Sequence, residues 1–105
     1  MLYLKEQPTI KDFQKYVAEM ERERGFSEEF IIQKCLLLGE EVGELYKAVR
    51  KTEKIKVDEN STFGSVSQEL SDVLIYLCAI ANHFDIDLEK AFREKEELNK
   101  KRVWK

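Results

Sequence analysis

Apolar residues recur at intervals of three and four through most of the chain, the spacing that places side chains on one face of a helix. The pattern predicts helices over residues 10–24, 28–52, 65–84 and 88–102. Thr9, Ser27 and Asp87 suit the N-cap positions before three of these helices, because each side chain offers an oxygen to free backbone N–H groups. Residues 53–64 are polar and aperiodic and are expected to form a mobile loop. We therefore predict a single all-α domain over residues 1–105.

The third predicted helix contains a run, Val73–Ala81, that is apolar on nearly every side. A chain of 105 residues has too small a core to enclose such a helix completely. Gly39 and Gly43, one turn apart in the second predicted helix, weaken that helix but let a ligand or another backbone come close. The apolar run predicts that a second copy completes the helical bundle, in a homodimer or homotetramer, whereas the glycines fit either tight helix packing or the approach of a ligand.

Two short acidic motifs lie on the inward sides of the second and third predicted helices. Glu41 and Glu44 border the apolar face of one helix, and Glu69 and Asp72 share one face of the next. Carboxylates that meet inside a helical protein repel one another and lose hydration, so they are tolerated only when paired or bound to metal. The sequence offers few cations nearby, and an all-oxygen ligand set is typical of Mg²⁺ or Mn²⁺. We therefore predict that these four acids bind a divalent metal ion.

Composition argues against several other classes of function. The net charge is −3 without a basic stripe for nucleic acid, and no apolar run reaches the roughly 18–20 residues of a membrane span. Cys35 and Cys78 lack metal-ligand spacing and are predicted to be reduced core residues, with one buried disulfide as the alternative. His83 has no Glu three residues before it, which argues against a ferritin-like di-iron site. No signal peptide is visible, so we expect a cytoplasmic protein.

Two motifs and a terminal segment carry a resemblance to a known family. The motifs are Glu-Glu-Val-Gly-Glu-Leu at 40–45 and Glu-Leu-Ser-Asp-Val-Leu-Ile-Tyr at 69–76. In the last predicted helix, Lys95, Asn99 and Arg102 share one face and are followed by Val103-Trp104. Together they resemble the ExxE, ExxD and terminal Lys…Asn…Arg-(aromatic) pattern of the MazG-like, all-α nucleoside triphosphate pyrophosphohydrolases, including the small dCTP pyrophosphatase-type members.

The resemblance implies hydrolysis of a nucleoside triphosphate between its α and β phosphates, which yields the monophosphate and pyrophosphate. It also implies an all-α bundle built by oligomerisation, with Mg²⁺ held by the four acids. Our own hypothesis, from the chemistry of the carboxylates, is that Glu41 or Glu44 takes a proton from a metal-bound water. A dNTP is the favoured substrate. Phosphoribosyl-ATP pyrophosphatase and dimeric dUTPase remain alternatives within the superfamily, and a non-catalytic interaction module is the alternative from another class.

Roles in binding the substrate follow for four further residues. Lys95 and Arg102 would hold the β and γ phosphates, and Asn99 would donate a hydrogen bond. The alternative for all three is a solvated, charged helix face. Tyr76, one turn beyond Asp72, would touch the phosphate or the sugar, or is an ordinary core tyrosine.

Overall fold

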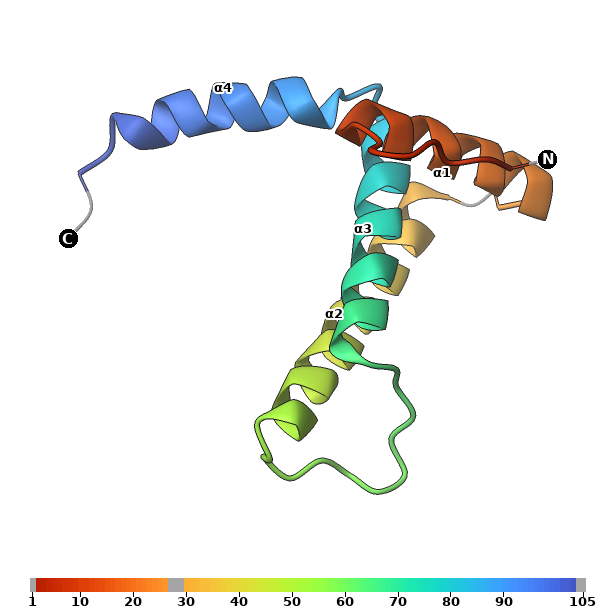
Figure 1. Ribbon diagram of the computed structural model, residues 1–105, viewed down its shortest axis with the longest axis vertical. Helices are drawn as coiled ribbons and strands as arrows, with labels where there is room; N and C mark the ends of the chain where they lie inside the picture. The colour runs from red at the N-terminus through yellow and green to blue at the C-terminus, as the bar shows by residue number, and fades with distance from the viewer. Residues whose placement is uncertain (1, 27–29, 104–105) are drawn as a thin grey trace.

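The computed structural model describes residues 2–26 and 30–103. Within them lie four helices and no strand: α1 (Ile10–Arg24), α2 (Ile31–Thr52), α3 (Val66–His83) and α4 (Leu88–Lys100). α2 and α3 run antiparallel and side by side, α1 crosses the end of α3, and α4 points away from the other three (Figure 1). The prediction of an all-α chain is confirmed. None of the described helices combines the length and the apolar character needed to cross a bilayer.

The helix ends follow local hydrogen-bonding signals. Thr9 Oγ1 accepts a hydrogen bond from the Asp12 N–H at 3.2 Å, and the Asp12 carboxylate accepts one from the Thr9 N–H at 2.8 Å. Ser65 and Asp87 cap α3 and α4 with their side-chain oxygens. Gly25 ends α1 with a φ of 76°, a left-handed conformation that glycine adopts without strain.

Two helix boundaries differ from the prediction by more than one residue. The first residue of α2 is Ile31, and the Phe30 N–H before it donates to Gln33 Oε1 at 3.3 Å. Ser27, predicted to cap this helix, lies outside the described residues. α4 ends at Lys100, before the predicted end at 102, because no residue of this helix is buried to hold its last turn in place.

The core lies where α1 crosses α3. Val17 and Met20 from α1 pack against Cys78 and Ala79 from α3, and Cys78 is 0% exposed. Cys35 is a free thiol exposed on α2, so the prediction that it belongs to the core is wrong. Apolar residues surround position 35 on nearly all sides of α2, and the spacing alone did not reveal which side turns away from α3.

Gln14 joins α1 to the turn between α3 and α4. Its amide donates to Asn82 Oδ1 at 3.2 Å and to the Ile86 carbonyl at 2.7 Å, and its Oε1 accepts from the Leu88 N–H at 2.9 Å. Asn82 Nδ2 returns a hydrogen bond to the Gln14 carbonyl at 2.8 Å. Because Gln14 is buried, these bonds fix the direction in which α4 leaves the body of the chain.

The isolated chain has an open shape. No residue of α4 is buried, and Phe92 on α4 is 68% exposed. The radius of gyration is 16.2 Å, against about 13 Å for a compact chain of this length. The exposed surface of 8600 Å² likewise exceeds the roughly 6100 Å² expected for a compact protein of this mass.

Two rows of apolar side chains face solvent. We call them the α2 row and the α3 row: Ile32, Leu36 and Tyr46 on α2, and Leu70, Leu74 and Leu77 on α3. Gly39 and Gly43 interrupt the α2 row at helical spacing. A Cβ at either glycine would have no described atom outside its own helix within 4 Å. The close approach predicted at these glycines is therefore not made by the described part of the chain.

Candidate metal centre

Three acidic side chains meet where α2 and α3 face each other. Glu41 on α2 and Glu69 and Asp72 on α3 each offer one carboxylate oxygen, and these oxygens all lie within 4.8 Å of one another. Residues 69 and 72 are three apart and therefore share one helix face. A divalent cation with oxygens at about 2.0–2.6 Å has opposite ligands about 4–5 Å apart, so the spacing suits a common ion.

Two of these carboxylates have a buried oxygen without a partner. Glu69 is only 3% exposed; its Oε1 accepts the Gly64 N–H at 2.6 Å, whereas its Oε2 has no hydrogen-bond partner among the described residues. Glu41 Oε2 is buried and unpaired in the same way. Buried carboxylate oxygens are expensive unless they are paired, protonated or bound to a cation. The donor set therefore fits a hard divalent ion such as Mg²⁺ or Mn²⁺.

The local electrostatics favour an added positive charge. Burial, together with the neighbouring charges of Glu44 and Asp72, raises the pKa of Glu41 to about 7. Burial and contact with Glu69 also raise the pKa of Glu44. Both shifts express the cost of holding several carboxylates together in reduced contact with water.

Glu44 lies beside the group but is not one of its three members. It is close enough to Glu69 and Glu41 for its carboxyl group to interact with both. The four acids singled out from the sequence are thus brought to one place, three as a tight group and one at its side. Which of them bind metal stays a prediction.

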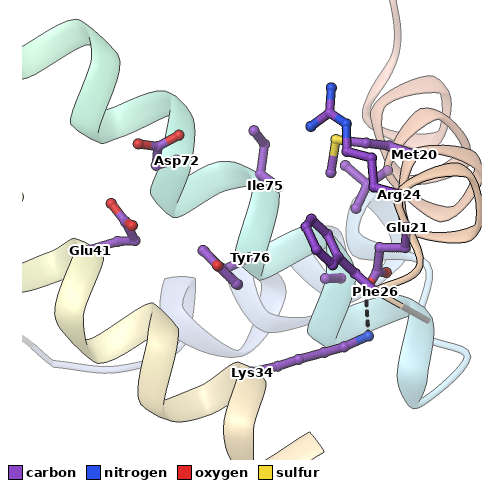
Figure 2. Close-up of a pocket in the computed structure, with 11 residues that line it drawn as sticks. Met20, Glu21, Arg24, Phe26, Lys34, Glu41, Asp72, Ile75 and Tyr76 are labelled. Atoms are coloured by element: carbon purple, nitrogen blue, oxygen red, sulfur yellow. Dashed lines mark hydrogen bonds and ion pairs between the residues drawn. The ribbon is translucent and has the colours of Figure 1, made fainter. Parts of the chain in front are cut away.

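A pocket of about 190 Å³ opens next to the acids between α1, α2 and α3. Glu41 and Asp72 lie at one end, and Tyr76 and Ile75 line its middle (Figure 2). At the other end, Lys34 on α2 forms an ion pair with Glu21 on α1. Tyr76 therefore lies within the same pocket as two of the predicted metal ligands.

The predicted phosphate-binding residues lie elsewhere. Lys95 and Asn99 are on α4, which points away from the α2–α3 pair that carries the acids, and Arg102 follows α4 (Figure 1). None of the three lines the pocket described above. Trp104, which completes the resembling segment, lies outside the described residues.

The Glu21–Lys34 ion pair was not found from the sequence. Glu21 is 8% and Lys34 is 6% exposed, so both charges are buried. Lys34 precedes Glu41 by two helical turns and so lies on the acid-bearing face of α2, a signal that was available. Its partner could not be inferred, because pairing α1 with α2 requires the tertiary fold.

Comparison with models of known protein families identifies the family of this chain. The family model described as the MazG nucleotide pyrophosphohydrolase domain matches residues 31–103, which include α2, α3 and α4. The chain belongs to the MazG nucleotide pyrophosphohydrolase family. The resemblance noted in the acidic motifs and the terminal segment is thereby confirmed at the level of the family.

Similar proteins agree with this membership of the MazG family. The chain is 35% identical over 102 residues to human dCTP pyrophosphatase 1, and 33% identical over 102 residues to the rat protein. Each comparison covers 91% of this chain and 59% of the relative, so the chain spans less than two thirds of the relatives' length. The crystal structure of iMazG from Vibrio DAT 722 shares 35% identity, with a TM-score of 0.62 over 88% of this chain and 98% of that chain. The all-α MazG-like fold is confirmed.

Proposed function

We propose that the chain hydrolyses a nucleoside triphosphate, preferably a dNTP, between the α and β phosphates, with Mg²⁺ as cofactor and Mn²⁺ as a possible substitute. The supporting observation is the meeting of Glu41, Glu69 and Asp72, two of which hold a buried oxygen that has no partner in the described part of the chain. Bare carboxylates would repel the roughly four negative charges of a triphosphate, so a cation must lie between them. Membership of the MazG family and the likeness to dCTP pyrophosphatase 1 support the reaction. We infer a role in clearing surplus nucleotides in the cytoplasm.

The residues of the site take separate parts in this reaction. Glu41, Glu69 and Asp72 would hold the metal ion, which when bound neutralises phosphate charge and makes a coordinated water more acidic. The Gly64 N–H holds the Glu69 carboxylate in place. We assign to Glu44, which lies beside the group, the role of taking the proton from the attacking water. Glu41 is the alternative for this step.

We further propose that Lys95, Asn99 and Arg102 bind the β and γ phosphates at the site of a second copy. In one chain, α4 leads these residues away from the acids (Figure 1). The exposed surface of 8600 Å² is about 2500 Å² more than a compact chain of this mass exposes. A stable interface needs about 800 Å² from each partner. The excess, together with the α2 and α3 rows, supports a homodimer or homotetramer.

Subunit mixing tests whether a second copy supplies these residues. Glu69→Gln removes a metal ligand and Lys95→Glu reverses the charge of a proposed phosphate ligand, so each variant alone is expected to be nearly inactive. When the two are unfolded together and refolded, half of the dimers are mixed and each contains one intact site, which restores about a quarter of wild-type activity. Residues acting within a single chain would give no recovery.

The reaction itself is tested by measuring products. The wild-type protein is incubated with each dNTP and NTP in Mg²⁺, Mn²⁺ or EDTA, and pyrophosphate and orthophosphate are quantified separately. We expect equal amounts of pyrophosphate and monophosphate, no turnover in EDTA, and loss of turnover in Glu69→Gln. Release of orthophosphate, or turnover in EDTA, would contradict the proposal.

A non-catalytic helical interaction module remains the rival from another class. The presence of all four carboxylates favours the enzyme. Thermal unfolding with and without millimolar Mg²⁺ separates the two, because a ligand that binds only the folded state raises the unfolding midpoint. An unchanged midpoint would favour the rival.

A further inference from the structure

The proposed reaction gives no part to the Glu21–Lys34 ion pair, which lies in the same pocket as Glu41 and Asp72. Both residues are more than nine-tenths buried and both line the pocket. Replacing a buried ion pair by well-packed apolar residues is often neutral or stabilising. Stability alone therefore gives little reason to place this pair at the wall of a cavity.

The pair has hydrogen-bonding capacity to spare. A lysine ammonium carries three N–H donors and a carboxylate has two acceptor oxygens. Among the described residues, the Lys34 ammonium and the Glu21 carboxylate interact only with each other, through Lys34 Nζ and Glu21 Oε2. A donor and an acceptor therefore remain side by side for a molecule that enters the pocket.

The position of the pair in the pocket indicates which part of a nucleotide it would meet. Glu41 and Asp72 lie at the opposite end, with Tyr76 between them and the ion pair (Figure 2). A nucleotide whose triphosphate lies at the acids can extend along the pocket only toward Glu21 and Lys34. Its base, the end farthest from the phosphates, then arrives at the ion pair.

We infer that the Glu21–Lys34 pair binds the hydrogen-bonding edge of the nucleobase, an inference that rests on the proposed function. Lys34 donates to a ring nitrogen or carbonyl oxygen of the base, and Glu21 accepts from the neighbouring amino or ring N–H group. Hydrogen bonds of this kind are strong because one partner is charged. Every common base has a donor beside an acceptor on this edge, so the pair selects an unblocked edge and not one particular base.

The wild-type protein allows a first test. The kinetics of dCTP are compared with those of N4,N4-dimethyl-dCTP, which has lost its amino donors, and of 5-methyl-dCTP, which carries a methyl group away from the edge. Loss of a charged hydrogen bond predicts a roughly ten- to hundredfold lower kcat/KM for the dimethyl compound. The 5-methyl compound is expected to behave like dCTP. Equal kcat/KM for dCTP and the dimethyl compound would overturn the inference.

A double variant provides the second test. Glu21→Gln with Lys34→Met removes both charges and keeps similar volumes, so no unpaired charge is left in the interior. It is expected to raise KM for dCTP about tenfold or more and to abolish discrimination against the dimethyl compound. Turnover of methyl triphosphate, which has no base, should be unchanged. The matched control is Lys15→Met with Glu23→Gln, both exposed on α1.

Measuring the binding of dCMP by calorimetry distinguishes a failure of this inference from a failure of the proposed function. If the wild-type protein hydrolyses no triphosphate but binds dCMP, and the double variant does not, the proposed function fails while edge recognition stands. If the double variant is active and retains wild-type discrimination and dCMP affinity, edge recognition fails while the pyrophosphohydrolase proposal stands. Circular dichroism of both variants confirms that each is folded.

Discussion

The charge of Glu41 should destabilise the metal-free protein, so removing it should have opposite effects with and without metal. In the folded chain, burial and the adjacent charges of Glu44 and Asp72 raise the pKa of Glu41 from 4.5 to about 7. A raised carboxyl pKa means that the folded state holds the proton more tightly than the unfolded state. The metal-free protein therefore loses stability as the pH rises from 4.5 to about 7, and the loss is complete above that range.

The pKa shift of Glu41 sets the size of the expected change in the free energy of unfolding. At about 1.4 kcal/mol per pKa unit, a change from 4.5 to about 7 corresponds to at most about 3 kcal/mol. Water screens part of the repulsion because the side chain is only half-buried, so we expect about 1–2 kcal/mol. Glu41→Gln should accordingly raise the free energy of unfolding by this amount at pH 8 in EDTA, and by little below pH 4.5. With millimolar Mg²⁺ the order reverses, because only the wild-type protein keeps all the acids of the site.

Urea denaturation followed by circular dichroism measures these differences at pH 4, pH 6 and pH 8, in EDTA and in Mg²⁺. Glu40→Gln is the matched control, because Glu40 is exposed on the same helix and next to Glu41 in sequence. Equal stability of wild-type protein and Glu41→Gln at pH 8 in EDTA would refute the argument from crowded carboxylates. Equal stabilisation of both by Mg²⁺ would remove Glu41 from the metal site.

Three further predictions concern the rest of the fold. Gln14→Leu should lower the free energy of unfolding by about 1–2 kcal/mol, since it leaves the part-buried Leu88 N–H and Ile86 C=O without their partner. A loss below about 0.5 kcal/mol in urea titration would contradict the role of the Gln14 network. With a thiol reagent, Cys35 should react in the native protein, whereas Cys78 should react only after unfolding. Cys78 is 0% exposed, and burial raises the pKa of its thiol. Equal reaction rates of the two thiols in the native protein would show that the core opens readily. Asp12→Asn should destabilise the protein at neutral pH but not in strong acid. The hydrogen bonds from the Thr9 backbone and hydroxyl, with help from Lys5, lower the pKa of Asp12 below 3.8, so their stabilisation is lost as the pH falls through the lowered pKa; an effect of equal size at pH 2 and pH 7 would disprove this cap.

Local signals made most of the helix layout predictable. The Thr9–Asp12 capping box and Gly25 act within a few residues of one another, so the limits of α1 followed from the sequence. The start of α2 did not, because Ile31 follows residues without a comparable signal among those described. The direction of α4 was also beyond prediction, because it depends on Gln14, far away in sequence.

The candidate site was predictable only as far as helix periodicity extends. The sequence spacing placed Glu69 and Asp72 on one helix face and Glu41 on another helix. It did not predict the distance between the carboxylates of the two helices. The Gly64 hydrogen bond to Glu69 and the Glu21–Lys34 pair depend on how separate segments pack. The spacing of residues within a single helix does not predict contacts between separate segments.

The constraint on position 64 is spatial and not chemical. A methyl group there would lie 2.9 Å from Glu69 Oε1 and 2.5 Å from Gln68 Oε1, closer than real side chains allow. Exchange of this residue for alanine would displace the Glu69 carboxylate without altering any charge. In a saturation-mutagenesis screen, substitutions at position 64 should therefore lower activity by moving the Glu69 carboxylate, although glycine has no functional group of its own.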